Sequence, residues 1–271
     1  PSEGFIKTHY ISFDRLNPFF LTNQSGWDIK NLGFDYLSTR NNLIPKTNFR
    51  LFGSIAKNIQ IKINELNPKL IHAHFGKNGA IVLPFAKKSL LPLFVTFHGG
   101  DATKFIHLKN SRYRVYNRRR NELIKYSKKF ICVSEFIAKR LSEQGFPDEK
   151  IVVNYIGIKP KDIDVIKKRN TKDKPFLFVG RLVEKKGISI LIKSFDSLNK
   201  GGFPNLKLNI IGSGPLENQL KKQSNNPNIS FLGWKTKTEI EKIMENSSAL
   251  IVPSHEARNG DSEGLPTVIL E

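Results

Sequence analysis

The last residues of the chain combine a glycine-bearing polar loop with two glutamates, Glu263 and Glu271. The apolar run 249–252 precedes the loop and predicts a buried strand, and Pro266 fits the first turn of a following helix. A strand–loop–helix turn directs backbone N–H groups and the positive end of a helix dipole at one point, which suits a phosphate. Carboxylates beside an anion site are costly unless they accept hydrogen bonds from groups such as hydroxyls. A sugar attached to a diphosphate supplies both, so the loop predicts a site for such a ligand.

A second candidate site lies between two glycines, Gly180 and Gly187, directly after the apolar run 176–179. Arg181 can bind phosphate oxygens through its guanidinium fork, and Lys186 can add a point charge. The glycines permit a tight turn where a strand meets a helix. A basic loop in a basic chain can also be an ordinary solvated face, but the bracketing glycines favour an anion site.

A third candidate site is the sequence His-Gly-Gly-Asp at 98–101, which follows the apolar run 93–97. The glycine pair lets a ligand approach the backbone. His98 could position a sugar hydroxyl, and Asp101 could orient the imidazole or accept a proton from an acceptor. The alternative is a structural turn around a core histidine, and the residues alone leave both interpretations open.

Weaker patterns give no metal site and no disulfide. His72 and His74 share one face of a strand, but no third ligand at metal-site spacing follows them. The Asp-Ile-Asp sequence at 162–164 falls in a polar stretch and is expected to be solvated. The Gly-Ser-Gly-Pro turn at 212–215 lacks the third glycine and the Lys-Ser/Thr of a phosphate loop, so it is open between a nucleotide-facing turn and a plain one. The lone cysteine, Cys132, is expected in the core.

The chain is basic, with Lys+Arg 44 against Asp+Glu 24 and a formal net charge of +20. Its 271 residues suffice for two ordinary domains, and a hydrophobic content of 39% excludes a disordered chain. The charge implies anionic partners: nucleic acid, a membrane surface or phosphorylated substrates. No run approaches the ~20 apolar residues of a spanning helix, and no signal peptide is visible. Because Pro1 is not Met and Glu271 falls in an apparent helix, we expect a fragment cut at both ends.

Strands and helices alternate along the chain, which is typical of parallel, doubly wound α/β layers. Such layers bind ligands at the carboxyl ends of their strands. Apolar runs predict strands at 19–21, 70–75, 93–97, 130–133, 151–153, 176–179, 206–211, 229–232 and 249–252. Helices are predicted near 1–16, 48–66, 79–88, 110–127, 135–144, 188–198, 215–223 and 237–246, with Ser134 as an N-cap. The segment 23–47 shows little periodicity.

The helix near 110–127 belongs to a basic stretch with interleaved aromatic and apolar residues. It could contact anionic lipid headgroups or nucleic acid, or it could be an exposed helix that packs on one side. The sequence leaves these interpretations open. The basic residues of the stretch are Arg112, Arg114, Arg118, Arg119, Arg120, Lys125, Lys128 and Lys129.

Taken together, these motifs resemble family 4 glycosyltransferases along about the whole chain. The donor-binding half of that family is similar to Gly180-Arg181-Leu182, Lys186-Gly187, the turn 212–215, Gly233-Trp234, and Glu263-Gly264-Leu265-Pro266 with Glu271. Residues 72–76 and 98–101 resemble the acceptor half of that family. The form of 259–266 resembles members that build exopolysaccharides such as colanic acid and amylovoran.

The resemblance implies an α/β fold of the GT-B type, with two facing Rossmann-like domains, parallel sheets and an interdomain cleft. An acceptor-side domain would cover residues 1–158, with its first strand missing. A linker would cover 159–174, and an incomplete domain for the nucleotide-sugar donor would cover 175–271.

The resemblance also implies roles for single residues. Arg181 and Lys186, in the loop opened by Gly180, would hold the donor diphosphate and stabilise the leaving group. Glu263 would contact sugar hydroxyls and lie near Arg181 and Lys186. Gly264 and Leu265 would offer backbone N–H groups, and Glu271 would bind the ribose. His98 would touch the transferred sugar near its anomeric carbon, across the cleft, with Asp101 beside it.

We therefore expect a retaining, metal-independent hexosyltransferase without a cofactor. It would use a nucleotide-diphosphate sugar and a saccharide or lipid-linked acceptor in cell-surface polysaccharide biosynthesis. Its expected location is cytoplasmic, with peripheral contact to the inner face of the membrane and no nucleic acid partner. The alternative is a basic, nonenzymatic protein that binds nucleic acid or membrane through residues 112–129. The paired glutamates argue against it, because they do not help to bind a polyanion.

Overall fold

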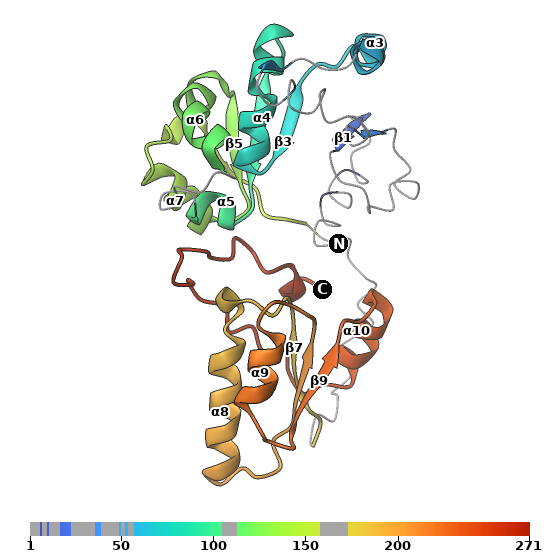
Figure 1. The fold of residues 1–271 in the computed structure, drawn as a ribbon, viewed down its shortest axis with the longest axis vertical. Helices are drawn as coiled ribbons and strands as arrows, with labels where there is room; N and C mark the ends of the chain where they lie inside the picture. Colours follow the sequence, from blue (N-terminus) through green and yellow to red (C-terminus); the bar gives the residue numbers. More distant parts are fainter. Residues whose placement is uncertain are drawn as a thin grey trace. The chain divides into compact units, whose positions relative to one another are not determined.

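The computed structural model of the chain describes residues 57–104, 113–157 and 173–271, together with 6, 10, 17–22, 36–38, 49, 52 and 53. The chain divides into two compact units, Pro1–Lys159 and Pro160–Glu271, and each is described by itself (Figure 1). Most of the predicted linker at 159–174, the Asp-Ile-Asp sequence and most of the helix predicted at 1–16 lie outside the described residues.

The first unit is built on a parallel sheet whose strands are adjacent in the order β3-β4-β5-β6. A parallel sheet is covered on both faces, so its strands are short apolar runs, as the sequence predicted. The small parallel pair of β1 and β2 stands apart from this sheet. β2 was not predicted, because the segment around it lacks periodicity. The strands are β1 (Phe20–Thr22), β2 (Tyr36–Ser38), β3 (Ile71–His74), β4 (Leu93–Phe97), β5 (Lys129–Cys132) and β6 (Ile151–Val153).

The helices of the first unit follow its strands. α4 and α6 pack against each other, and α7 begins at the predicted N-cap, where the Ser134 hydroxyl accepts a hydrogen bond from the Ile137 N–H at 3.4 Å. The helices are α3 (Lys57–Leu66), α4 (Gly76–Lys88), α5 (Gly100–Thr103), α6 (Arg114–Tyr126), α7 (Glu135–Ser142) and the 3₁₀ turn η3 (Asp148–Lys150).

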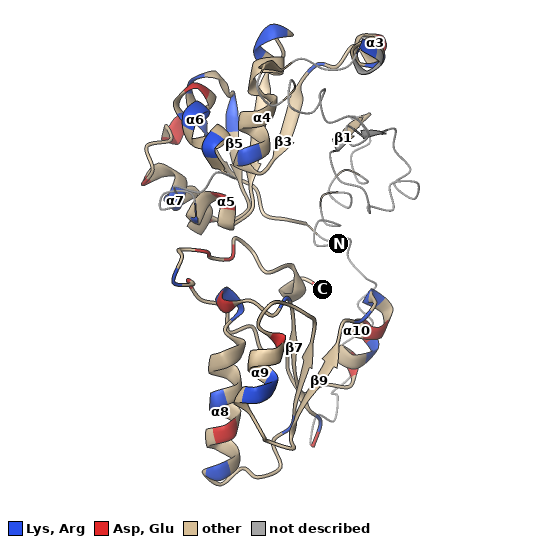
Figure 2. Cartoon of the chain, in the orientation of Figure 1, with Lys and Arg blue, Asp and Glu red and all other residues tan. Residues whose placement is uncertain are grey.

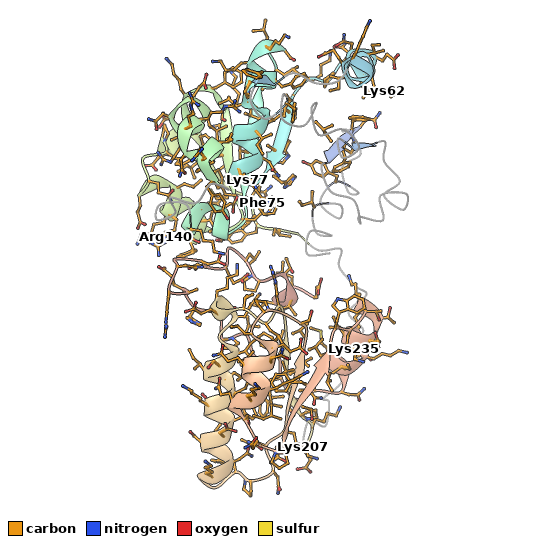
Figure 3. All side chains as sticks on the ribbon, viewed as in Figure 1. Lys62, Phe75, Lys77, Arg140, Lys207 and Lys235 are labelled. Carbon is orange, nitrogen blue, oxygen red and sulfur yellow. The ribbon has the colours of Figure 1, made fainter. Side chains whose placement is uncertain are left out.

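Aromatic side chains make up much of the core of the first unit. Figure 3 draws the described side chains on the ribbon. Phe97 and Phe130 are fully buried, and both meet Phe146 edge-on with ring centroids 5.7 and 4.8 Å apart. Cys132 is buried among these residues, as predicted. Burial raises the pKa of its thiol to about 12, so the thiol stays protonated and unreactive at neutral pH.

The second unit repeats the design with a parallel sheet in the order β7-β8-β9. One face of α8 is buried through Ile188, Leu191, Ile192 and Phe195, as the periodicity predicted, and its core is continuous with the sheet. The elements are β7 (Phe176–Val179), η4 (Glu184–Lys186), α8 (Ile188–Lys200), β8 (Leu208–Ile211), α9 (Glu217–Gln223), β9 (Ile229–Gly233), α10 (Lys237–Glu245) and η5 (Thr267–Ile269).

The last predicted strand and helix differ from expectation. The run 249–252 pairs with β7 through a single parallel bridge, in which Leu177 N–H donates to the Ala249 carbonyl at 2.9 Å and Ile251 N–H to the Leu177 carbonyl at 2.8 Å. Pro253 has no N–H to extend the ladder. After Pro266 the chain forms the 3₁₀ turn η5 instead of an α-helix, with bonds from residue i to i−3.

Close backbone contacts hold the loops at the carboxyl edge of β7–β9 together. A Cβ atom added to Gly187, whose φ is +70°, would lie 2.0 Å from the Pro253 carbonyl oxygen. A Cβ atom added to Gly212 would lie 1.9 Å from the Gly180 carbonyl oxygen. Only glycine permits these approaches, so the loops after β7 and β8 and the segment after the bridge form one surface.

In the ranges given above, no helix combines the length and apolar character that crossing a bilayer requires.

The contact at Gly187 predicts a large cost for adding one methyl group. Gly187→Ala meets both a left-handed φ and the Pro253 carbonyl, whereas Gly233→Ala meets a φ of +68° with nothing within 4 Å. We expect Gly233→Ala to lower the free energy of unfolding by about 1–2 kcal/mol and Gly187→Ala by about 1–3 kcal/mol more. Amide hydrogen exchange in β8 measures both. Equal costs would show that the loops are not in firm contact.

Candidate functional site

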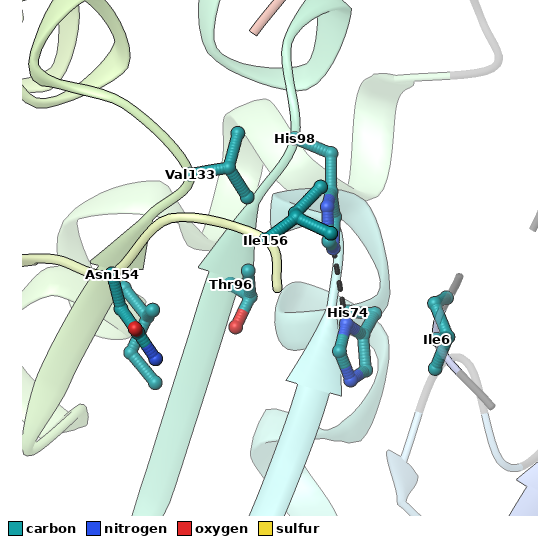
Figure 4. A pocket seen from close by; sticks show the side chains of 8 residues that line it. Ile6, His74, Thr96, His98, Val133, Asn154 and Ile156 are labelled. Carbon is teal, nitrogen blue, oxygen red and sulfur yellow. Dashed lines mark hydrogen bonds between the residues drawn. The ribbon is translucent and has the colours of Figure 1, made fainter. Parts of the chain in front are cut away.

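A pocket lies at the carboxyl edge of the first sheet, where parallel sheets bind ligands. Its walls come from the ends of β3, β4 and β5 and from the segment after β6, with one residue from the start of the chain (Figure 4). His98 and His74 meet inside it. The lining residues are Ile6, His74, Thr96, His98, Ile131, Val133, Asn154 and Ile156.

The buried carboxylate of Asp101, in α5, fixes the turn that carries His98. One oxygen, Oδ1, accepts hydrogen bonds from the N–H groups of His98 and Gly99, both at 2.9 Å, and Oδ2 accepts from the N–H of Gly76 at 3.1 Å. The sequence suggested that Asp101 orients the imidazole. The carboxylate instead binds the backbone around it and links the turn to the start of α4.

Burial raises the pKa of Asp101 to about 6, against the hydrogen bonds from His98, Gly76 and Gly99, which act to lower it. At neutral pH the group is therefore mostly ionised, and three backbone donors surround its charge. Such a carboxylate is a rigid part of the turn and is poorly placed to take a proton from an incoming ligand.

The imidazole of His98 contacts a second histidine. Its Nε2 lies 3.0 Å from Nδ1 of His74, and the ring packs against Phe75 with centroids 4.7 Å apart. The His74 ring contacts Tyr10, which also contacts His72. Sequence reasoning gave His72 and His74 no chemistry. Their spacing of two on one strand was the signal that they share a face, and the structure places His74 against His98 and His72 against His74.

The second unit brings together four charged side chains. Two come from the loop after β7, and two come from the polar loop that follows the run 249–252, which we call the terminal loop. Lys185 Nζ lies 3.3 Å from Asp261 Oδ1 and 3.2 Å from Glu263 Oε1, and Lys186 Nζ lies 3.3 Å from the same glutamate oxygen. All four side chains are at least four-fifths buried. We call these four residues the charge cluster. Sequence reasoning missed Lys185 and Asp261, although the Lys-Lys pair and the acids two positions apart were visible.

Arg181 lies in the same loop but is exposed. Within residues 173–271 it forms no ion pair. Glu263, which was predicted to lie near Arg181 and Lys186, pairs with Lys186 as predicted and with Lys185. The backbone on either side of Arg181 is fixed, because Gly180 N–H donates to the Ile211 carbonyl and Leu182 N–H to the Ser213 carbonyl, both at 3.0 Å. The guanidinium is therefore free to bind a ligand while its backbone is held.

The terminal loop is tied to η4 along its length. His255 N–H donates to the Lys185 carbonyl at 2.9 Å, and Arg258 N–H donates to Glu184 Oε1 at 3.1 Å. Beyond these contacts, the N–H groups of Gly264 and Leu265 have no acceptor among the described residues of this unit. They remain available to an anion.

The other predicted residues of this unit differ in what surrounds them. Gly180 lies against the side chains of Phe178 and Lys186, so its turn lies next to the charge cluster. Glu271 is exposed, and its N–H donates to the Thr267 carbonyl at 3.3 Å. Its predicted role toward a ribose stays a prediction.

The charges suit a ligand that carries both phosphates and hydroxyls. Arg181, Lys185 and Lys186 supply three cations against the two carboxylates of Asp261 and Glu263. A diphosphate can draw the lysines toward its oxygens, and Glu263 can then accept hydrogen bonds from hydroxyls. Across the described part of the chain, no three His, Cys, Asp or Glu side chains are arranged to hold a metal ion.

Basic residues lie along α6 (Figure 2), and some of them make structural contacts. Arg119 donates to the Ala80 carbonyl at 3.0 Å, and Arg120 donates to the Gln144 carbonyl and lies over the Phe146 ring at 4.9 Å. Arg114, Arg118 and Lys125 are exposed instead. Their spacing puts them on one side of the helix, so a narrow basic stripe remains. Arg112 lies outside the described residues.

Two protein families match adjacent parts of the chain. The family described as Glycosyltransferase Family 4 matches residues 20–162, and the family described as Glycosyl transferases group 1 matches residues 160–271.

Among curated proteins, the chain is 30% identical over 208 residues to the amylovoran biosynthesis glycosyltransferase AmsK of Erwinia amylovora, covering 73% of this chain and 49% of that protein. It is 23% identical over 248 residues to the putative colanic acid biosynthesis glycosyltransferase WcaL of Escherichia coli strain K12, covering 86% of this chain and 59% of that protein. The chain thus spans about half the length of the curated relatives it matches.

Two solved structures share the fold. The apo form of the lipopolysaccharide outer core galactosyltransferase WaaB has a TM-score of 0.64 at 18% identity, covering 99% of this chain and 72% of its own. Anabaena HepE in complex with UDP has a TM-score of 0.62 at 18% identity, covering 89% of this chain and 65% of its own.

The burial of Asp101 predicts a pH dependence for the first unit. Its pKa, about 6 when folded, exceeds the model-peptide value of 3.8, so the folded state binds more protons between these values and stability falls as pH rises from about 4 to about 6. The loss is on the order of 3 kcal/mol. We expect Asp101→Asn to remove this fall in stability with rising pH. Asp196→Asn, in the other unit, should leave the fall unchanged. Urea midpoints read from amide exchange in β4 test this, and an unchanged slope in Asp101→Asn would contradict it.

Proposed function

The chain belongs to glycosyltransferase family 4, and from this we propose that the full-length protein is a retaining hexosyltransferase that uses a nucleoside-diphosphate sugar. Its two α/β units with parallel sheets confirm the predicted GT-B fold. The observation that carries the proposal is the charge cluster beside Arg181, because it offers cations to a diphosphate and a carboxylate to a sugar in one place.

The acceptor is proposed to be a saccharide or a lipid-linked saccharide of a cell-surface polysaccharide. The printed names of the matched relatives, amylovoran and colanic acid biosynthesis glycosyltransferases, support this class. The donor is proposed to carry a nucleoside diphosphate, which agrees with the UDP in the HepE complex.

In the proposed reaction, the bond between the sugar anomeric carbon and the diphosphate oxygen breaks, and a bond from an acceptor hydroxyl forms on the same face. The hydroxyl proton passes to the departing diphosphate oxygen. Arg181 and Lys186 would stabilise the charge that develops on that oxygen, together with N–H donors from Gly264 and Leu265. This stabilisation would make the largest contribution to lowering the activation free energy. Because side chains and backbone groups would supply this stabilisation, we propose that no metal ion or cofactor takes part.

The remaining residues would position the sugars. Glu263 would accept hydrogen bonds from hydroxyls of the transferred sugar, and Glu271 would bind the ribose. His98, from the first unit, would contact the transferred sugar near its anomeric carbon. Asp101 would act through the turn that carries His98, since its oxygens are bound to backbone N–H groups.

We place the protein in the cytoplasm with peripheral contact to the inner face of the membrane. The basic stripe of Arg114, Arg118 and Lys125 on α6 supports this contact, because anionic headgroups attract clustered basic side chains. No nucleic acid partner is proposed.

Replacing Arg181 or Glu263 should slow transfer strongly. The full-length protein, supplied with candidate UDP- and GDP-sugars in EDTA, is expected to release nucleoside diphosphate. Arg181→Ala should lower the rate by about 10²–10³-fold, the cost of losing one preorganised group that stabilises transition-state charge, and Glu263→Gln should also be impaired.

Arg258→Ala is the matched control, because it removes the same charge from a side chain that is 97% exposed. It should leave the rate unchanged. An active Arg181→Ala variant would overturn the site assignment. A protein that binds no nucleotide sugar, but binds DNA or RNA with an affinity that falls steeply with salt, would support the nonenzymatic alternative.

The basic stripe should govern membrane contact. At low salt the protein is expected to float with vesicles that contain anionic lipid, and a triple Gln variant at Arg114, Arg118 and Lys125 should float less. The control is a triple Gln variant at Lys193, Lys200 and Lys207, which lowers the net charge equally with exposed residues of the other unit. Flotation lost equally in both variants would indicate general charge attraction, and no flotation of the wild type would contradict the proposal.

A further inference from the structure

The two adjacent lysines of the charge cluster differ in how many carboxylates hold them. The Lys185 ammonium lies 3.3 Å from Asp261 Oδ1 and 3.2 Å from Glu263 Oε1. Lys186 Nζ lies 3.3 Å from the same oxygen of Glu263, and it pairs with no other acid in the part of this unit that the structure describes. Lys185 therefore joins two acids, and Lys186 shares one of them.

The Lys186 side chain lies beside the residue that precedes Arg181. A Cβ atom added to Gly180 would lie 3.6 Å from Lys186 Cε. Lys186 is therefore placed to share a diphosphate with Arg181. A lysine that turns to a phosphate leaves its carboxylates, so Lys186 would give up one ion pair where Lys185 would give up two.

Lys185 also ties the terminal loop to η4 at two points. Its carbonyl accepts a hydrogen bond from the His255 N–H at 2.9 Å, and its ammonium reaches Asp261 and Glu263 further along the loop. A residue that binds a loop at both ends of a segment limits how far the segment can move. The hold of Lys185 on residues 255–263 is thus independent of any ligand.

The segment between these two points folds back on itself. Ala257 N–H donates to the Asp261 carbonyl at 2.9 Å, Gly260 N–H donates to the Ala257 carbonyl at 2.8 Å, and Asp261 N–H donates to Asn259 Oδ1 at 3.0 Å. Ala257 is buried. The turn sets the position of Asp261, and the Lys185 ammonium connects this turn to Glu263, two residues later.

Without Lys185, two carboxylates would be left close together. Their oxygens both lie within 3.3 Å of one ammonium, so they would repel each other once that cation was removed. The Asp261 side chain is 13% exposed and that of Glu263 is 18% exposed, so water screens the repulsion only in part. Lys186 would be drawn to both acids and would be less available to a phosphate.

We propose that Lys185 is a positioning residue, which keeps Glu263 in place when a diphosphate draws Lys186 away. Lys185 stays with Asp261 and Glu263, while Lys186 moves to the phosphate. The task assigned to Lys186, and the benefit to a sugar bound by Glu263, rest on the proposed function. The hold of Lys185 on the terminal loop does not.

The first test needs no ligand, because amide hydrogen exchange of Ala257 in the full-length protein reports opening of the terminal loop. We expect Lys185→Met to speed this exchange about tenfold, since it leaves two mostly buried carboxylates without their shared cation. Lys185→Arg, which keeps the charge, should restore most of the protection. Asp261→Asn removes the same ion pair from the other side and is the second variant should Lys185→Met fold poorly.

The matched control for exchange is Lys186→Met, the same substitution one position along η4. It should change the exchange of Ala257 by less than about twofold, because Glu263 keeps its pair with Lys185. Exchange in β8 should stay as in the wild type for both variants, which shows that the unit is folded. Equal effects of the two substitutions on Ala257 would overturn the hold of Lys185 on the loop.

The second test asks which lysine binds phosphate, with inorganic pyrophosphate as the probe. It compares Lys185→Met with Lys186→Met, each combined with Asp261→Asn. Both double variants keep the net charge of the protein, and any other effect of the Asp261 change is common to both. We expect the first to bind pyrophosphate within about threefold of the wild type and the second about tenfold more weakly, since it loses a charge-assisted hydrogen bond to the phosphate.

Equal losses in the two double variants, or a larger loss in the one that lacks Lys185, would show that Lys185 binds the phosphate itself and would overturn the proposal. A wild type that neither binds pyrophosphate nor releases nucleoside diphosphate from UDP- or GDP-sugars would contradict the proposed function. Exchange at Ala257 would then still decide whether Lys185 holds the loop.

Transfer kinetics test whether Lys185 acts through Glu263. With Asp261→Asn as the reference, adding Lys185→Met is expected to lower kcat about tenfold by misplacing Glu263, with the KM for the donor little changed. When the reference also carries Glu263→Gln, the same addition should lower kcat by less than about twofold, because residues that act as a unit are not additive. A second tenfold loss in that background would overturn the positioning role.

Discussion

The second unit depends on backbone segments that touch without side chains between them. Gly187 meets the Pro253 carbonyl, and Gly212 meets the Gly180 carbonyl, at distances that leave no room for a Cβ atom. These contacts bring the loop after β7 and the terminal loop to one edge of the sheet. The lysines of one loop can then reach the carboxylates of the other, although these residues are more than 70 positions apart in sequence.

The two units meet the same problem, the placement of polar groups at a sheet edge, by different means. The second unit uses opposite charges: Lys185 pairs with both Asp261 and Glu263, and Lys186 pairs with Glu263. The first unit uses one buried carboxylate, Asp101, whose oxygens accept from backbone N–H groups. The charge cluster can rearrange, because its members are side chains. The Asp101 turn cannot do so without losing bonds to the main chain.

Much of this arrangement follows from the sequence, because parallel strands are apolar runs and their ends carry the polar residues. The strands β3 to β9 and the Ser134 cap were predicted for that reason. The partners of each site residue could not be predicted in the same way. Glu263 was expected near Arg181 and Lys186, and it does pair with Lys186, but its second partner is Lys185 of the 3₁₀ turn η4 and not Arg181. His98 contacts His74, which in turn contacts Tyr10, a residue 88 positions before His98 that the strand pattern could not bring to this sheet edge.

The burial of Cys132 gives the chain a practical property. Since its thiol is enclosed, carries a raised pKa and is the only one among the 271 residues, alkylating reagents should find no target on the native surface. A cysteine introduced at an exposed position of each unit would then be labelled without removal of the natural one. Fluorophores attached in this way would report the distance between the two units.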